Sequence, residues 1–466
     1  NNSLLNSAYS GDSAWVTGID TNYYDAENSW IASPCYDLSS LERPMIKVWI
    51  NSAMQENDGA VLQSTINSGE SWQNVGAVNT GINWFNLNGL EGSPGSQSIT
   101  QGNVGWSDTT TSWLEGRHSL DNLLAETKVR FRIAFGSNTT DSSSAEGIAF
   151  DDIWIGDRER LVLLEHFTNL GISPNISVNT IVNSNPKDVV DIQYHTSFPT
   201  DDQFNTDNPA DPSSRVLYYG VTQVTYSHMD GNQYSGNNWT QNDLDFRILQ
   251  DPQFDIELSS TIIGSVIKIN STITSRNDLD SSNITLQVAI TESNINFGGS
   301  NYSSVLKALL PDGAGVSYEK AWLAGESATT YNSYDLTNLY DEQLFEVIAF
   351  VQNNKSKEVY QVAFNDSAQL SSSVIVEQIV DALNYDFALF PNPTRNNATL
   401  LLGDEIVGDI QVVILNQMGQ VVSTEILSDG TTKSQIDLSS QSSGVYFVQI
   451  NSHGHNLGVK KLVLNK

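Results

Sequence analysis

The sequence is poor in cysteine, in positive charge and in long apolar runs. Cys35 is the only cysteine among 466 residues, so the chain forms no internal disulfide and no zinc site that needs two thiolates. Lysine and arginine number 22 against 54 aspartates and glutamates, a net charge of −32 that excludes binding to a nucleic acid. No run of about 18 apolar residues occurs, so the sequence predicts no transmembrane segment.

The chain instead has a polar but weakly charged composition. Only 16% of its residues are charged, so serine, threonine, asparagine and glutamine supply most of its solubility. Apolar residues make up 39%, enough for several folded modules. This balance is typical of an extracellular protein. Asn1 opens neither the basic nor the apolar part of a signal peptide, so we expect that peptide to be removed or to lie upstream.

Residues 1–157 are set apart by their tryptophans. Alternating apolar and polar residues at 45–50 and 128–135 predict strands with one buried face, and turn residues between them favour an antiparallel sandwich. The segment 146–155 resembles the closing strand of MAM-like jelly rolls, so we predict a jelly roll that is N-terminally incomplete. Eight of the ten tryptophans lie in it: Trp15, Trp30, Trp49, Trp72, Trp84, Trp106, Trp113 and Trp154.

Two kinds of ligand are suggested for this jelly roll. The resemblance implies a structural calcium ion near the last strand, with Asp151 and Asp152 as candidates. Adjacent residues on a strand point to opposite faces, so only one of them enters a given site, and solvated carboxylates are the alternative. The tryptophans either stack on sugar rings or fill the core. Calcium is the one cofactor that the sequence suggests.

Residues 158–252 change to a strand, helix, strand pattern. The run 163–175 resembles the strand, turn and helix start of a thioredoxin-like domain in the Omp28-related family of Bacteroidetes surface proteins. In such folds two redox cysteines stand at the helix start, and here Ile172 and Asn175 occupy their places. Thr225 stands where the resemblance implies a cis-proline. We therefore expect a degenerate thioredoxin-like domain without disulfide exchange.

Three histidines fall in the same region. His166 follows Glu165, and His195 and His228 lie further along the chain. A metal or acid–base site is one interpretation of this group, but no H-E-x-x-H spacing supports it. Histidines that are simply hydrogen-bonded or exposed are the other interpretation.

The resemblance to the Omp28-related family continues through 253–366. Strands are expected at 266–269, 284–290 and 345–351, which predicts an Ig-like β-sandwich. Residues 367–385 then form the predicted linker to the last module. Asp-Ser-Ala triplets at Ser13 and Ser367 match an O-glycosylation pattern, although so short a motif also arises by chance.

The last module, 386–466, carries four local features in a fixed order. They are a Pro-Asn-Pro segment, a turn with glycine, a glycine-led strand and a basic final strand. The ordered set resembles the type A C-terminal sorting domain of proteins exported by the type IX secretion system of Bacteroidetes. The residues that the resemblance implies in export recognition are Pro391, Asn392, Pro393, Gly419, Gly444, Tyr446, Lys460 and Lys461.

The resemblance to sorting domains names partners and a location. It implies recognition by the outer-membrane translocon and its shuttle barrel, with the final strand pairing to the partner by β-addition. In the family the tail is normally clipped off, often with replacement by an anionic lipopolysaccharide link. The chain would cross the periplasm and be secreted or stay on the outer-membrane cell surface.

Together these features predict a multidomain, mainly β protein. Its modules are a jelly-roll sandwich, a thioredoxin-like α/β domain, an Ig-like β-sandwich and a C-terminal β-sandwich sorting domain. We expect a non-catalytic protein that serves adhesion or binds a glycan or a surface-protein ligand. The alternative is the accessory and export region of a larger secreted hydrolase, either a peptidase or a glycan-active enzyme.

Overall fold

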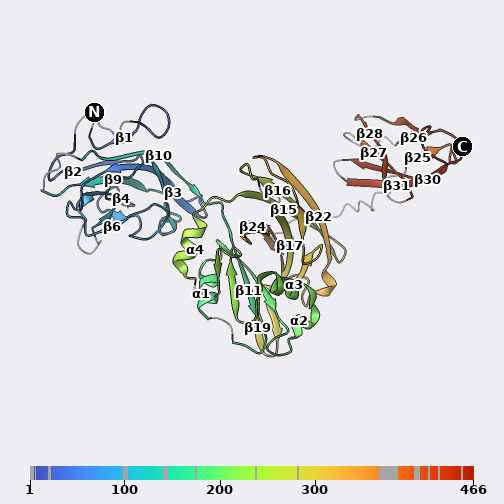
Figure 1. The fold of residues 1–466 in the computed structure, drawn as a ribbon, viewed down its shortest axis with the longest axis horizontal. Helices are drawn as coiled ribbons and strands as arrows, with labels where there is room; N and C mark the ends of the chain where they lie inside the picture. Colours follow the sequence, from blue (N-terminus) through green and yellow to red (C-terminus); the bar gives the residue numbers. More distant parts are fainter. Residues whose placement is uncertain are drawn as a thin grey trace. The chain divides into compact units, whose positions relative to one another are not determined.

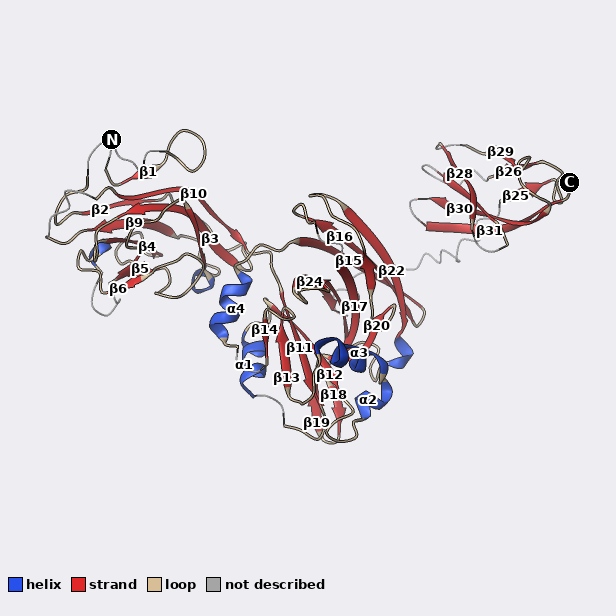
Figure 2. Cartoon of the chain, viewed as in Figure 1, coloured by secondary structure: helices blue, strands red, loops and turns tan. Residues whose placement is uncertain are grey.

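The structure is a computed structural model, and strands dominate it, which confirms the mainly β prediction (Figure 2). By its internal contacts the chain forms two compact units, 1–372 and 373–466 (Figure 1). No helix in the described part is long and apolar enough to cross a membrane. The structure describes all residues except 1–4, 6, 19–21, 98–102, 140–144, 174–175, 237–238, 281–282, 367–386, 403–409, 418–419, 429–430 and 453–454.

The N-terminal module is built from two antiparallel sheets. The first has the order β1 (Trp15–Val16), β10 (Gly147–Asp157), β3 (Pro44–Ala53), β8 (Leu114–Ser119). The second has the order β2 (Asn28–Ala32), β9 (Arg130–Gly136), β4 (Gly59–Thr65), β5 (Gln73–Asn74). Residues of both sheets share one cluster of buried apolar side chains, so the sheets face each other across one core. Smaller elements complete the module: β6 (Leu87–Asn88), β7 (Val104–Gly105), η1 (Pro94–Ser96) and η3 (Asp121–Leu123).

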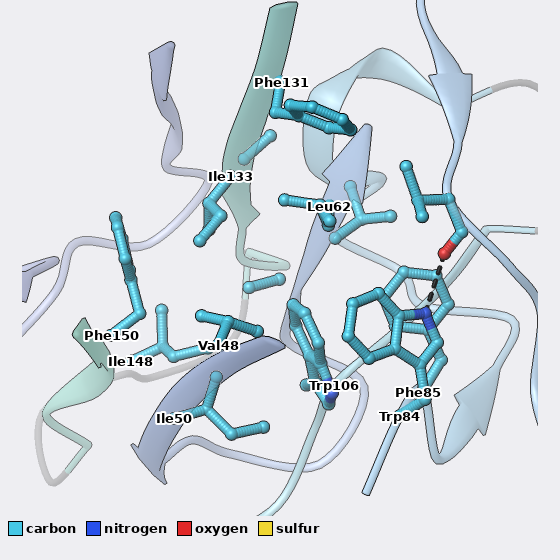
Figure 3. Close-up of a cluster of buried hydrophobic side chains, with 14 of the residues drawn as sticks. Val48, Ile50, Leu62, Trp84, Phe85, Trp106, Phe131, Ile133, Ile148 and Phe150 are labelled. Atoms are coloured by element: carbon cyan, nitrogen blue, oxygen red, sulfur yellow. Dashed lines mark hydrogen bonds between the residues drawn. The ribbon is translucent and has the colours of Figure 1, made fainter. Parts of the chain in front are cut away.

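Two of the eight tryptophans lie in this core. Trp84 and Trp106 meet edge to face with ring centres 5.0 Å apart, among side chains from both sheets (Figure 3). The indole Nε1 of Trp84 donates a hydrogen bond of 2.7 Å to the carbonyl oxygen of Val75, which satisfies its one buried polar atom (Figure 3). Trp15 and Trp30, by contrast, are each 59% exposed. Some of the tryptophans of this module therefore lie in the core and others lie at the surface.

The middle of the chain begins with a parallel pair of strands joined by a helix. Strand β11 (Val162–Thr168) leads through α1 (Ile176–Ser184) to β12 (Val189–His195), and the two strands pair in parallel. Strand β13 (Tyr226–Met229) pairs antiparallel with β11, and β14 (Tyr234–Ser235) extends the sheet to the order β14-β13-β11-β12. The remaining helices are α2 (Gln203–Asp207), α3 (Ala210–Tyr219) and α4 (Gln241–Ile248).

Helices cover both faces of this sheet. On one face, Leu164 and Met229 pack with side chains of α1 and α4. On the other face, Phe167 and Tyr194 lie in a cluster that Tyr219 of α3 adjoins. Figure 2 shows α1 and α4 next to each other beside the strands. The arrangement follows from strand geometry, because successive residues of β11 point to opposite faces.

The sheet does not end at residue 252. Strand β12 also pairs with β20 through Gln193 and Val305, which makes one sheet of nine strands within the described residues. The predicted boundary between 158–252 and 253–366 thus falls inside a shared sheet. Pairing with β20 covers the edge that β12 would otherwise expose. The added strands are β17 (Ile284–Glu292), β20 (Val305–Leu310), β21 (Val316–Tyr318), β23 (Phe345–Asn353) and β24 (Val359–Asp366).

A second sheet packs against this half of the molecule. It has the order β15 (Phe254–Ile263), β16 (Val266–Ser275), β22 (Ser327–Asp335), and Phe254 and Trp322 contribute to the shared core. The hairpin of β18 (Ile295–Phe297) and β19 (Ser300–Tyr302) projects between β17 and β20, and η4 (Leu336–Asn338) follows β22.

The second unit is a small sandwich. One sheet has the order β25 (Ala388–Phe390), β26 (Asn397–Leu401), β29 (Lys433–Asp437). The other has the order β28 (Val421–Leu427), β27 (Ile410–Leu415), β30 (Gly444–Ser452), β31 (His455–Leu464). Alternate residues of both sheets are buried between them, which makes an apolar core. Strand β31 lies at the edge of its sheet, which is the position that pairing by β-addition requires.

Candidate functional site

A cavity of about 500 Å³ lies at the carboxyl ends of β11 and β12. Its wall is formed by those two strands, the loop that follows β11, helix α1, the start of β13 and the β18–β19 hairpin. The carboxyl ends of parallel strands are where open α/β sheets bind ligands, and the volume suits a small molecule. This cavity is the candidate site.

One wall of the cavity holds a buried histidine–aspartate pair. His195 Nδ1 and Asp202 Oδ2 are 2.8 Å apart, and both side chains are almost fully buried. Burial favours a raised pKa for Asp202, but hydrogen bonds from His195 and from the amides of Leu170 and Asn205 lower that pKa below its ordinary value. Asp202 is thus ionised and also caps α2. It fixes the imidazole while Nε2 of His195 has no partner among the described residues.

A second histidine–aspartate pair lines the same cavity. His166 Nδ1 lies 3.0 Å from Asp191 Oδ1, which is an ion-pair distance, although the contact lacks the angles of a hydrogen bond. Nε2 of His166 has no partner among the described residues. Register places His166 opposite Gln193 on β12 and opposite Ser227 on β13, so these residues share one face. Unpartnered polar atoms this deeply buried are rare in folded proteins.

The loop after β11 is held in place by Asn169. Its side-chain nitrogen donates to the carbonyl oxygens of Thr196 and Thr200, each at 2.8 Å. Its side-chain oxygen accepts from the Gly171 amide and the Thr200 hydroxyl, also at 2.8 Å. All of its hydrogen-bonding capacity is therefore used to fix this loop over the cavity.

Two of the three positions where the resemblance implies lost redox residues line this cavity. Ile172 and Thr225 both line it, and the peptide bond between Val224 and Thr225 is cis. Asn175 lies outside the described residues. Cys35, the only sulfur nucleophile in the sequence, is exposed in the N-terminal module. The site therefore contains no thiol.

The opposite face of the same sheet holds a saturated polar cluster. Glu165 Oε1 accepts hydrogen bonds from Tyr194 and from two nitrogens of Arg215, and Oε2 accepts from Tyr219 at 2.5 Å. Burial, with the nearby Glu165 charge, raises the pKa of Tyr194 and of Tyr219 well above the usual value. Burial opposes the charge on Arg215, but Glu165 and the two tyrosines raise its pKa. Both tyrosines therefore remain neutral donors.

Asp151 and Asp152 hold an N-terminal loop. Asp151 Oδ2 accepts from the amides of Tyr9 and Ser10 at 3.1 and 3.2 Å, and Asp152 Oδ1 accepts from the Ser10 hydroxyl at 2.9 Å. Both carboxylates reach one loop because β10 has an irregularity here and Asp152 has a φ of 44°, which breaks the alternation assumed for a regular strand. No group of three or more His, Cys, Asp or Glu side chains that could hold a metal ion occurs in the described part, and calcium stays a prediction.

The Pro-Asn-Pro segment lies along the last strand. Asn392 Nδ2 donates to the carbonyl oxygen of Lys461 at 2.7 Å, and its Oδ1 accepts from the amide of Val463 at 2.9 Å. Thr394 continues the contact as a parallel bridge to Leu464. Pro391 and Pro393 flank this contact and are exposed. The segment thus covers part of the open edge of β31.

The other predicted recognition residues differ in exposure. Lys461 is exposed, whereas Lys460 Nζ lies 5.4 Å from the centre of the Phe387 ring. Tyr446 belongs to the core and donates to the carbonyl oxygen of Ser442. A methyl group added at Gly444 would meet no atom closer than 3.8 Å, so close packing does not demand a glycine there. Gly419 lies outside the described residues.

Of the two O-glycosylation candidates, the structure describes one. Ser13 is exposed, and Ser367 lies outside the described residues.

The sequence interpretation missed Asp191 and Asp202, although it noted their partners His166 and His195. The register of β11 against β12 is the signal that brings Asp191 to His166, and no sequence pattern supplies that register.

Comparisons with known proteins identify the last unit. Residues 388–465 match the family described as the secretion system C-terminal sorting domain. The protein is a substrate of the type IX secretion system. It is therefore exported across the outer membrane to the cell surface or the extracellular space, and its tail interacts with the secretion machinery. No curated protein matches the sequence significantly.

The solved structures that resemble this type IX substrate do so only weakly. HBP35 of Porphyromonas gingivalis matches with 16% identity and a TM-score of 0.40, over 66% of this chain and 100% of that one. A β-glucosidase from Kluyveromyces marxianus matches with 12% identity and a TM-score of 0.17, over 73% and 44%. Two fibronectin type III domains of chicken tenascin match with 11% identity and a TM-score of 0.16, over 46% and 99%. Scores this low carry no argument about function.

Proposed function

We propose that the exported chain is a non-catalytic ligand-binding protein that serves adhesion at the cell surface. The observation that carries this proposal is the cavity at the ends of β11 and β12. Ile172 and Thr225, the positions where a thioredoxin-like enzyme would need its cysteine and its proline, line it without any thiol. Two buried imidazoles present unpartnered nitrogens instead.

The surrounding topology supports a degenerate thioredoxin-like domain. The order β14-β13-β11-β12, with a parallel central pair and helices on both faces, suits that interpretation. The sheet of β15, β16 and β22 suits an Ig-like sandwich, and the paired antiparallel sheets of the N-terminal module suit a jelly roll. We therefore propose that this cavity corresponds to the redox site of a thioredoxin-like domain and now binds a ligand instead of exchanging disulfides.

The histidine environment suggests the chemistry of the ligand. Nδ1 of His195 faces the carboxylate of Asp202, so Nε2 is the ring nitrogen left to meet a ligand, and in the tautomer that carries its proton on Nδ1 this nitrogen is a hydrogen-bond acceptor. A ligand that donates hydrogen bonds from hydroxyl or amine groups fits this acceptor. Asn301, Ser303 and Ser304 supply further polar side chains around it. We propose a small sugar or amino compound as the ligand class.

Thermal unfolding of the full chain tests this proposal. The probes are single monosaccharides, disaccharides and amino acids, and a ligand that binds the folded state raises Tm. We expect at least one probe to raise Tm, and His195→Gln to abolish that shift. The matched control is His228→Gln, since His228 is also buried with an unpartnered Nε2 but lies outside the cavity lining.

Two outcomes contradict the proposal. Equal loss of the shift in His195→Gln and His228→Gln places the binding elsewhere. Chemical conversion of a stabilising probe, followed by mass spectrometry, contradicts a non-catalytic role. If no probe shifts Tm at millimolar concentration, the cavity does not bind this ligand class.

For export, we propose that Lys461 contacts the secretion machinery directly. Its side chain is exposed next to Phe447 on β30, whereas Lys460 lies over the Phe387 ring. Lys461→Ala should lower the amount of protein in the medium of the native host without lowering the stability of the tail. Normal secretion of this variant would contradict the contact. Exposed Lys433 on β29 offers the control substitution Lys433→Ala.

A further inference from the structure

Three cations lie on strand β9 of the N-terminal module or just before its start, and no ion pair joins them to a carboxylate of the described residues. Lys128, Arg130 and Arg132 alternate with the buried residues Val129 and Phe131, so they point away from the core. Within the described part of the chain, none of the three lies at ion-pair distance from a carboxylate. Seven other arginines of the first unit do form such pairs: Arg43, Arg117, Arg158, Arg160, Arg215, Arg247 and Arg276.

The guanidinium of Arg132 lies near two indole rings. Its Cζ lies 4.3 Å from the ring centre of Trp72 and 5.8 Å from that of Trp30. Nε donates to Gln63 Oε1 at 2.9 Å, and Nη2 donates to the Gly95 carbonyl oxygen at 2.8 Å. Burial lowers the pKa of Arg132, because the charged guanidinium has lost part of its hydration. A bound anion would stabilise that charge in place of the lost water. The group is thus rigid before any ligand arrives.

A row of amides continues from Arg132 across the sheet. Gln63 on β4 donates to Asn74 on β5 at 2.9 Å, and Asn74 donates to Gln97 at 2.7 Å. Trp30 on β2 stands at the other end of this row and is 59% exposed. We call the set of Trp30, Arg132, Trp72 and Gln63 the indole–arginine platform. It combines indole surface with a cation, while Gln63, which is only 1% exposed, holds the guanidinium from below.

We propose that the indole–arginine platform binds an acidic polysaccharide. Pyranose rings would lie against the indole faces, and a carboxylate or sulfate group would bind Arg132, with Arg130 and Lys128 attracting further acidic groups along the chain. The chain has a net charge of −32, so most of its surface repels an acidic polymer. The cations Lys128, Arg130 and Arg132 mark a place where such a polymer could bind. This inference rests on the proposed adhesive role and adds a site apart from the cavity.

Affinity electrophoresis of the full chain tests the platform. The gels contain polygalacturonate for carboxylate groups, dextran sulfate for sulfate groups, or neutral dextran. We expect retardation by at least one acidic polymer and none by neutral dextran, with weaker retardation as salt is added. Retardation by polygalacturonate alone or by dextran sulfate alone supports the inference and identifies the anionic group.

Two variants and a matched control locate the binding. Trp30→Ala and Arg132→Gln should each weaken retardation about tenfold, the change expected from losing a charged hydrogen bond or a stacking surface. Trp154→Ala removes an indole that is 44% exposed and lies 5.2 Å from Lys47 on the other sheet, and it should change nothing. Because Trp30 is mostly exposed, its variant should fold even if Arg132→Gln does not.

Several results would overturn the inference. They are no retardation by either acidic polymer, equal loss in Trp154→Ala, or binding to vesicles of anionic phospholipid that is as strong as binding to the polymers. Failure here differs from failure of the cavity proposal. The His195→Gln thermal shifts do not involve the platform, so either proposal can fail while the other holds.

Discussion

The two faces of the central sheet differ most clearly at two neighbouring residues of β11. Glu165 on one face accepts three hydrogen bonds on Oε1 and one on Oε2, from Arg215, Tyr194 and Tyr219. His166 on the other face keeps Nε2 without a partner in the described structure. A saturated polar cluster stabilises a fold, whereas an unsaturated one is a place where a ligand gains by binding. Alternation along β11 thus places the acceptor Glu165, with all its hydrogen bonds made, and the unpartnered imidazole nitrogen of His166 on opposite faces of the sheet.

Glu165→Gln should have the largest effect. The change leaves the buried Arg215 charge without a counterion, and breaking such a pair destabilises a protein by about 3 to 5 kcal/mol. Urea unfolding measures the loss. Tyr194→Phe is the control, because it removes the one hydrogen bond that Tyr194 donates to Glu165 and should lose only about 1 kcal/mol. A loss below that value for Glu165→Gln would show that the cluster is not what stabilises this face.

Asp202→Asn should come second. The carboxylate caps α2 and orients His195, so its loss should lower the free energy of unfolding by about 1 to 3 kcal/mol at neutral pH. The pKa of Asp202 is lowered in the folded state, so its contribution is complete above the unfolded pKa of about 3.9 and is lost as pH falls through the folded pKa. The difference between wild type and variant should therefore shrink at acid pH. A constant difference would contradict an ionised Asp202.

His228→Phe should change the pH dependence of stability. Burial lowers the pKa of His228, although the charge of Glu165 partly opposes this, and the unfolded pKa is about 6.5. The unfolded state therefore binds more protons below pH 6.5, so wild-type stability should be complete above that pH and decline as pH falls towards the folded pKa. The variant should show a flatter decline between pH 7.5 and 5.5 in urea titrations. An unchanged slope would assign the decline to other groups.

His166→Gln should have the smallest effect on stability. Its Nε2 makes no hydrogen bond that the substitution could break, so we expect a change below about 1 kcal/mol together with weaker probe binding in the cavity. If His166→Gln lowered the free energy of unfolding as much as Glu165→Gln does, the two faces of the sheet would not differ in their contribution to stability.

Much of the secondary structure was predictable from local patterns. Alternation identified β3 and β9, and the change of pattern after residue 160 identified β11, α1 and β12. The same patterns could not show that Gln193 pairs with Val305, because strand partners far apart in sequence are set by packing. They also could not separate the buried Trp84 from the exposed Trp30, since each has a polar residue before it and an apolar residue after it.

The candidate site was predictable only in part. The resemblance placed Ile172 and Thr225 together, and both line the cavity. The aspartates that hold the histidines were not identifiable, because Asp191 acts across a strand register and Asp202 acts from a helix cap. The irregularity at Asp152 was likewise invisible to an argument that assumes regular strands.

The contact between Asn392 and the final strand has a consequence for the chain before it leaves the cell. Its side-chain amide imitates a neighbouring strand, with one bond given to Lys461 and one taken from Val463. A bare strand edge invites identical molecules to join edge to edge and aggregate. Because Asn392 occupies the edge at Lys461 and Val463, fewer backbone groups of β31 are left for edge-to-edge pairing between identical chains.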